Sequence, residues 1–188
     1  MTVIFSNAGD EDCEMLRELW KDLDNLNLIE LDQYYTIKNA KKIVRDAISE
    51  EEDFLILCGH GSPGGLFLPS LLGYAFDETD IPYVKAKNIL CIWCNANKFC
   101  ENYEFYCLTS SMYISNTSEA IYYNFNENNN QEFINETNSN TFQTMNNYIK
   151  NNIPLQEWTN LLIENVDKTN AIDTFNRKGL IYYKEIIT

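Results

Sequence analysis

Basic side chains are scarce in this sequence of 188 residues. It contains 14 lysines and arginines against 28 aspartates and glutamates, which gives a net charge of −14. Because so negative a surface repels polyanions, nucleic acid and anionic membranes are excluded as expected partners. A protein or peptide substrate, and a regulatory protein, remain as the partners that we expect.

Long hydrophobic runs and an export signal are also missing. No stretch approaches 18 consecutive apolar residues, and no charged-then-apolar leader follows Met1. We therefore expect a cytoplasmic protein. In that compartment most of the six cysteines should be reduced thiols, and those inside apolar runs should be core residues.

Histidine occurs once, as His60. A single histidine argues against an Asp/His metal cluster, and we expect neither a metal nor a cofactor. The sequence also has no Gly-x-Ser-x-Gly or Gly-x-Cys-x-Gly elbow, and the glycine-rich segment 61–65 lacks the Gly-Lys-Ser/Thr ending of a phosphate loop. These absences count against elbow-type hydrolases and amidotransferases, and against nucleotide binding through such a loop.

What is present is a series of apolar runs that alternate with amphipathic segments. Hydrophobic residues make up 45% of the chain, enough for a sizeable core. The pattern predicts an α/β three-layer sandwich with a mostly parallel central sheet, built from one domain over 1–188. Within it we expect a core over 1–125, an asparagine-rich loop over about 126–140, and C-terminal helices with a last strand over 141–188.

The local patterns set the expected elements. The first helix should be capped by Asp10 or Asp12 and continue to Leu23. Further helices are expected over 40–48, 81–86, 95–103, 117–125, 142–149 and 154–166. Strands are expected over 2–6, 28–31, 53–58, 89–93, 106–115 and 180–183, with a small hairpin or irregular excursion over 66–68 and 71–76.

Two strand ends carry the candidate chemistry. His60 follows one apolar run, within the segment 58–65 (CGHGSPGG), and Cys94 ends the next run, 88–94 (NILCIWC). Because functional groups of open α/β sheets gather at the carboxyl ends of strands, we expect these two side chains to meet across one cleft. Cys94 would attack a carbonyl as a thiolate, and His60 would hold the proton and protonate the leaving amine.

The neighbouring backbone would support this pair. The amides of Gly61 and Cys94 are candidates for stabilising the oxyanion of the intermediate. A helix that begins at Asn95 would bring its positive end to Cys94 and lower the pKa of that thiol.

Other interpretations of the same residues stay open. Cys91-x-x-Cys94, with Cys100 and Cys107, could be a zinc site or a redox pair, although residues three apart in a strand face opposite sides. Without a functional pair, His60 would be a structural residue and the chain a non-catalytic binding module. Acyl transfer through the same thiol is a third possibility.

Together the two strand-end motifs resemble the caspase-like (clan CD) cysteine peptidases, nearest to CHAT and clostripain-like domains. The resemblance covers roughly 2–115 and implies a caspase-haemoglobinase fold, a His60–Cys94 dyad and hydrolysis of a peptide bond without a cofactor. Two positions depart from the family pattern, since Ile92 replaces a frequent acidic residue and Trp93 an alanine or acidic residue. A preference for Arg or Lys is therefore not carried over, and an inactive, protein-binding member is the alternative.

Overall fold

A six-stranded sheet forms the centre of the computed structural model, which describes residues 1–7, 9–69, 73–125 and 130–184. The strand order is β2-β1-β3-β7-β8-β9, and every pair is parallel except β8 with β9. The strands are β1 (Thr2–Ser6), β2 (Asn27–Leu31), β3 (Phe54–Cys58), β7 (Asn88–Ile92), β8 (Leu108–Ser110) and β9 (Leu180–Tyr182). The expected mostly parallel sheet is confirmed.

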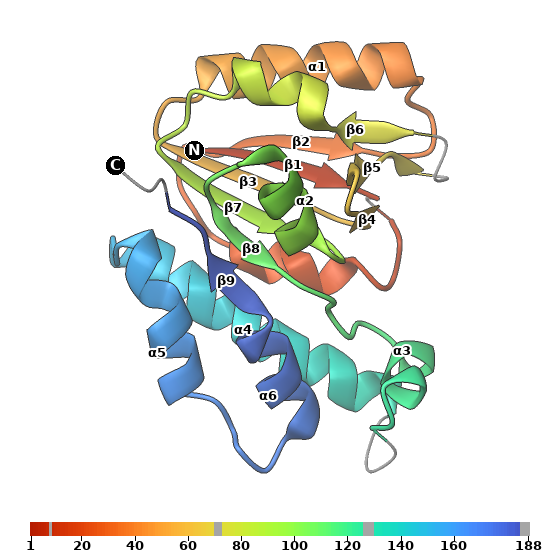
Figure 1. Cartoon of the computed structure of the whole chain (residues 1–188), viewed down its shortest axis with the longest axis vertical. Coiled ribbons are helices and arrows are strands. Elements are labelled where there is room, and N and C mark those ends of the chain that lie inside the picture. Colours follow the sequence, from red (N-terminus) through yellow and green to blue (C-terminus); the bar gives the residue numbers. More distant parts are fainter. Residues whose placement is uncertain (8, 70–72, 126–129, 185–188) are drawn as a thin grey trace.

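Helices cover both faces of this sheet (Figure 1). One face packs against α1 (Ile37–Glu50), the 3-10 helix η3 (Glu78–Tyr83) and α2 (Ala96–Tyr103). The other packs against the 3-10 helix η1 (Glu14–Leu19), α4 (Gln131–Lys150), the 3-10 helix η4 (Leu155–Glu157) and α5 (Trp158–Glu164). Next to α4 lie α3 (Thr117–Tyr122) and α6 (Ala171–Lys178). This is the expected three-layer α/β arrangement.

Side-chain alternation along the central strands builds two cores, one on each face. In β3, Leu55 and Leu57 enter the core beneath α1, whereas Ile56 and Cys58 enter the core beneath α4. Strand β7 alternates in the same way. Because both faces are buried, these strands read in the sequence as continuous apolar runs.

A second, small antiparallel sheet follows β3 directly. It consists of β4 (Gly61–Ser62), β5 (Gly65–Phe67) and β6 (Tyr74–Phe76), in the order β4-β5-β6. The expected hairpin over 66–68 and 71–76 corresponds to β5 and β6, and residues 71–72 of that prediction lie outside the described residues. Leu66 and Phe76 attach this sheet to the core on the α1 side.

The asparagine-rich loop expected over 126–140 is wrong for 131–140, which form the first half of α4. Asparagine is a poor residue within a helix but a good cap, and Asn130 accepts a hydrogen bond from the N–H of Phe133 at the helix start. Asn138 is fully buried and donates to the carbonyl oxygen of Ile114 over 2.9 Å. Tertiary hydrogen bonds thus override the local preference, while 126–129 lie outside the described residues.

Three other expected elements are corrected. The first helix is only the 3-10 helix η1, with Cys13 at its N-cap, and Asp10 instead accepts from the N–H of Asp12 in the preceding turn. The helix expected over 81–86 is the 3-10 helix η3, which begins earlier because Asp77 and Asp80 form a capping box. The strand expected over 106–115 is confined to β8, since Tyr113 and the residues around it continue as an extended loop.

All six cysteines are free, and five of them are buried, as expected for reduced core thiols. No helix among the described residues combines the length and apolar character that crossing a membrane requires.

Candidate active site at the carboxyl edge of the sheet

Strands β3 and β7 pair side by side up to the ends from which His60 and Cys94 follow. Cys58 is the register partner of Ile92, and the N–H of Gly59 donates to the carbonyl oxygen of Ile92 over 3.1 Å. His60 and Cys94 each follow two residues after that pair. Cys58 and Ile92 face the core toward η1 and α4, and the pocket that both His60 and Cys94 line includes Ile92, Cys13 and Leu16 of that core.

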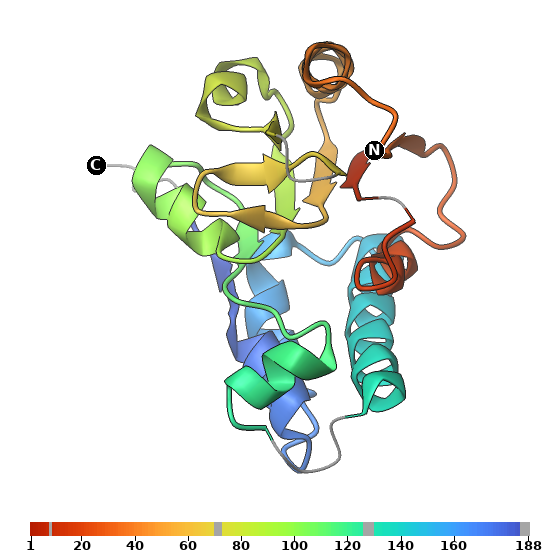
Figure 2. The same ribbon diagram turned by 90° about the vertical axis from the view of Figure 1, so that its right-hand side faces the viewer.

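His60 and Cys94 line one small pocket at the carboxyl ends of the parallel strands. Its walls come from the turn before η1, the ends of β3 and β7, and the loop after β8; they comprise Asp12, Cys13, Met15, Leu16, Gly59, His60, Ile92, Trp93, Cys94, Tyr113 and Ser115. Figure 2 looks onto this edge, with the β4–β6 sheet above, η1 at one side and α3 below. The two predicted residues are therefore brought together.

The backbone before His60 requires glycine. Gly59 has a φ of +140°, and a Cβ at this position would overlap the carbonyl oxygen of Ser6. The close approach lets the N–H of His60 donate to Oδ1 of Asn7 over 3.1 Å. The β1 strand end thereby fixes the start of the loop that carries His60.

The indole ring of Trp93 leaves no room for a side chain at Gly61. A Cβ on Gly61 would lie 2.5 Å from Cγ of Trp93 and 2.7 Å from the carbonyl oxygen of Gly65. The indole N–H of Trp93 donates to the carbonyl oxygen of Ser62 over 3.1 Å. Gly61 thus has a packing role that stands apart from its predicted role as an oxyanion donor.

The Cys94 thiol is held in its neutral form. Burial raises its pKa to about 11, and the negative charge of Glu119 acts in the same direction. The thiol donates to the carbonyl oxygen of Tyr113 over 3.9 Å. The expected lowering by the helix that follows is wrong in direction. Helix α2 does begin at Ala96, next to the thiol, but desolvation outweighs its dipole.

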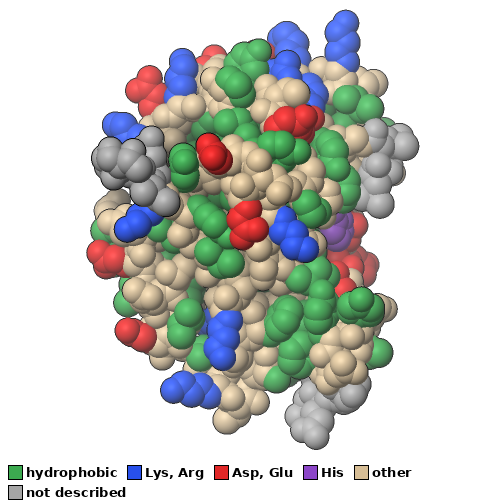
Figure 3. Space-filling view, in the orientation of Figure 1, with side chains coloured by type: hydrophobic (Ala, Val, Ile, Leu, Met, Phe, Trp, Pro, Cys, Tyr) green, Lys and Arg blue, Asp and Glu red, His purple; other side chains and the backbone are tan. Residues whose placement is uncertain are grey.

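The imidazole of His60 faces Asp10 in this structure. Nε2 of His60 lies 3.2 Å from Oδ2 of Asp10, and the two side chains are 32% and 44% exposed. His60 is the purple group at the edge of the molecule in Figure 3, beside acidic side chains in red. Among the described residues His60 and Cys94 are not hydrogen-bonded to each other, because each has another partner.

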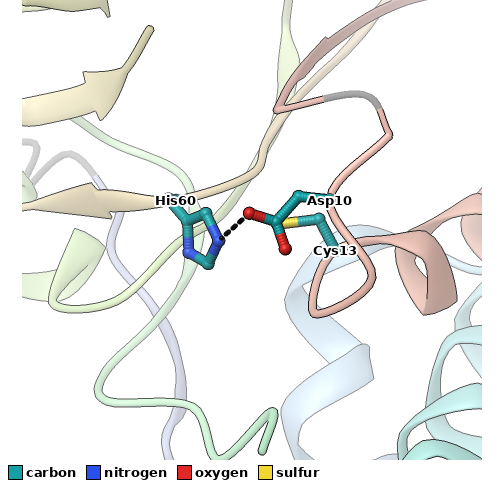
Figure 4. A group of neighbouring side chains, drawn as sticks. All are labelled: Asp10, Cys13 and His60. Atoms are coloured by element: carbon teal, nitrogen blue, oxygen red, sulfur yellow. Dashed lines mark hydrogen bonds and ion pairs between the residues drawn. The ribbon is translucent and has the colours of Figure 1, made fainter. Parts of the chain in front are cut away.

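Cys13 completes a group that the sequence did not reveal. The Cys13 sulfur, a carboxylate oxygen of Asp10 and a ring nitrogen of His60 all lie within 4.8 Å of one another (Figure 4). Cys13 is 2% exposed, and burial, with further contributions from the charges of Asp10 and Asp12, raises the pKa of its thiol far above the ordinary value. From the sequence, Asp10 is predicted only as a candidate helix cap, and the spacing Asp10-x-x-Cys13 is the one local signal for this group.

The alternative zinc or redox pair of Cys91 and Cys94 does not assemble. Cys91 points into the core beneath α1, whereas Cys94 lines the pocket on the η1 side. Cys100 and Cys107 lie on the Cys91 side, with their sulfur atoms 3.1 Å apart. Among the described residues, neither Cys91 nor Cys94 belongs to a group of three ligating side chains close enough to share one ion.

Comparison with known proteins finds no family model, no curated protein and no solved structure that matches this chain.

Proposed function

We propose that this protein is a cysteine endopeptidase in which Cys94 is the nucleophile and His60 the general base and acid. The observation that carries the proposal is that His60 and Cys94, each two residues past the paired ends of β3 and β7, line one pocket. The three-layer α/β arrangement agrees with the caspase-like fold that the two motifs imply. The site lies at the carboxyl edge of the sheet, where such folds carry their chemistry.

The reaction follows from the two side chains. As the substrate carbonyl approaches, His60 takes the proton of the Cys94 thiol and the sulfur forms a bond to the carbonyl carbon. The amides of Gly61 and Cys94 stabilise the oxyanion. The carbon–nitrogen bond then breaks as His60 returns the proton to the leaving amine, and water hydrolyses the resulting thioester with His60 again as the base.

Asp10 acts on this reaction as a positioning residue. Its carboxylate lies 3.2 Å from the ring nitrogen Nε2 of His60 and so fixes the orientation of the ring, which leaves Nδ1 as the nitrogen that accepts the thiol proton. In the resting site the Cys94 thiol is neutral, so proton transfer to His60 is part of the attack rather than a step completed beforehand.

A peptidyl acyloxymethyl ketone that reacts with activated thiols tests the proposal. We expect mass spectrometry of the labelled protein to find the adduct on Cys94, and His60→Gln to abolish labelling. Cys91→Ala is the matched control, because Cys91 lies on the same strand but faces the opposite side of the sheet. Labelling of Cys94 that is unchanged in His60→Gln would contradict the dyad.

One observation favours a second candidate, a catalytically inactive fold that binds a partner protein. The resting Cys94 is a neutral thiol whose hydrogen bond goes to Tyr113 rather than to His60. In that case no labelling of Cys94 above the level of the unfolded chain is expected. The same experiment therefore separates the two functions.

A further inference from the structure

We propose that Asp10, Cys13 and His60 form a binding site for a divalent transition metal ion of the zinc class, with its fourth coordination position open. The three side chains supply one carboxylate oxygen, one sulfur and one ring nitrogen, all within 4.8 Å of one another. Thiolate, imidazole and carboxylate together are a typical zinc ligand set, and the thiolate disfavours Mg²⁺ and Ca²⁺.

The spacing of the ligand atoms is close to what a tetrahedral ion needs. With metal–oxygen and metal–nitrogen bonds of about 2.0–2.1 Å, two such ligands lie about 3.3 Å apart. Oδ2 of Asp10 and Nε2 of His60 are already 3.2 Å apart. In a tetrahedral complex the sulfur of Cys13 would lie about 3.6 Å from each of these two atoms. The sulfur already lies within 4.8 Å of both, so only a small movement of the Cys13 side chain is needed.

The ligands are held by the backbone around them. The N–H of Cys13 donates to the carbonyl oxygen of Asp10 over 3.0 Å, which keeps these two residues in one turn. Oδ1 of Asp10 accepts from the N–H of Asp12 over 3.0 Å, so that Oδ2 is the oxygen directed at His60. A second shell of this kind orients ligands before the ion arrives.

The local charge favours a cation. The carboxylates of Asp10 and Asp12 lie in the same turn as Cys13, so a divalent ion bound there would meet two negative charges. Arg17 neutralises the neighbouring Glu14 through an ion pair of 2.6 Å. The side chains of Asp10 and His60 are partly exposed, which gives an ion a path from solvent.

Metal binding would inhibit the peptidase reaction, and this consequence rests on the proposed function. When Nε2 of His60 binds an ion, the neutral ring carries its proton on Nδ1, so neither ring nitrogen can accept the proton of Cys94. The metal-bound protein is therefore inactive as a peptidase, and removal of the ion releases His60.

Titration of the reduced protein with Co²⁺, followed by absorption spectroscopy, tests the site without reference to activity. We expect one equivalent of Co²⁺ to give a thiolate-to-metal charge-transfer band and the visible bands of a tetrahedral ion. Cys13→Ser should remove the charge-transfer band, and His60→Gln should weaken binding by more than the roughly 10- to 100-fold that loss of an outer-shell partner costs. Cys94→Ser is the matched control and should leave the spectrum unchanged.

Cys13→Ser is suited to this test because it replaces only the sulfur, and the side chain of Cys13 makes no capping hydrogen bond that the substitution would remove. Circular dichroism and thermal unfolding confirm the fold of each variant. A charge-transfer band that persists in Cys13→Ser, disappears in Cys94→Ser, or is absent from the unsubstituted protein would overturn the site.

Inhibition of the peptidase by the bound metal is tested separately, through the labelling of Cys94. Saturating Zn²⁺ should suppress acyloxymethyl ketone labelling of Cys94, and a chelator should restore it. Labelling that is unaffected by saturating Zn²⁺ overturns the inhibitory role. A Co²⁺ spectrum that meets every expectation in a protein whose Cys94 never labels supports the metal site and rejects the peptidase proposal.

Discussion

Trp93 donates its indole N–H to the carbonyl oxygen of Ser62, and this hydrogen bond of 3.1 Å ties the end of β7 to the loop that follows His60. The residue directly before Cys94 thus holds the backbone just after His60. Both halves of the proposed dyad are therefore positioned by one contact between their flanking residues.

Gly61→Ala should break this arrangement. The new Cβ would overlap the indole ring of Trp93, and overpacking of this kind costs about 1–3 kcal/mol in the free energy of unfolding. Urea denaturation followed by Trp fluorescence measures the loss. Labelling of Cys94 should fall as well, because the His60 loop must move. A Gly61→Ala protein of unchanged stability would contradict the packing.

Asp10→Asn should slow the labelling of Cys94 by about two- to fivefold without unfolding the protein. The pair with His60 is partly exposed, and such pairs contribute no more than about 1 kcal/mol. The effect should appear in the maximal rate of labelling rather than in the apparent affinity for the probe. Glu11→Gln removes one charge from the same turn and should leave the labelling rate of Cys94 unchanged. An equal fall in the labelling rate of both variants would show that the net charge of the turn matters, rather than the contact of Asp10 with His60.

The alkylation rate of Cys94 with iodoacetamide should rise about tenfold per pH unit as the pH approaches 11. The reactive species is the thiolate, and the pKa of the thiol is raised to about 11 in the folded protein. Mass spectrometry of the modified protein gives the rate at each pH below the onset of unfolding.

Glu119→Gln should move that profile to lower pH, because the charge of Glu119 contributes to the raised pKa of Cys94. Glutamine can still accept the hydrogen bonds that Ser115 donates to Glu119, so the local structure should persist. A profile that stays in place would leave burial as the sole cause of the raised pKa.

Asn138→Ala should destabilise the protein by about 1–3 kcal/mol. The substitution removes a buried donor to the carbonyl oxygen of Ile114 and leaves Nδ2 of Asn176 without one of its acceptors. Urea denaturation should show the difference. Asn147→Ala, at an exposed position of the same helix, should change stability by no more than about 0.5 kcal/mol. Equal effects of the two substitutions would argue against the buried network.

The central strands, and the position of His60 and Cys94 in one pocket at their carboxyl ends, could be predicted because the sequence pattern that indicates them is local. The apolar runs that form β3 and β7 are continuous, and the position two residues past the paired strand ends is a matter of register. The sequence therefore indicated both the sheet and the pocket that its carboxyl edge carries.

The remaining features depend on contacts between distant segments. Asp10 meets His60 across 50 residues, and no local pattern in the turn before η1 indicates that contact. The first half of α4 was missed because its asparagines disfavour a helix locally, while the hydrogen bond of Asn138 to Ile114 is tertiary. The raised pKa of Cys94 depends on burial, which the sequence of one strand end does not specify.

The buried asparagines also set an order of assembly. Ile114 lies between two residues of the pocket wall, Tyr113 and Ser115, and both its N–H and its carbonyl oxygen bond to Asn176, 62 residues later in the chain. During synthesis, His60 and Cys94 leave the ribosome well before Asn176 does. The wall beside Cys94 is fixed only when that asparagine arrives, so a nascent chain can contain both members of the dyad and still lack an assembled pocket.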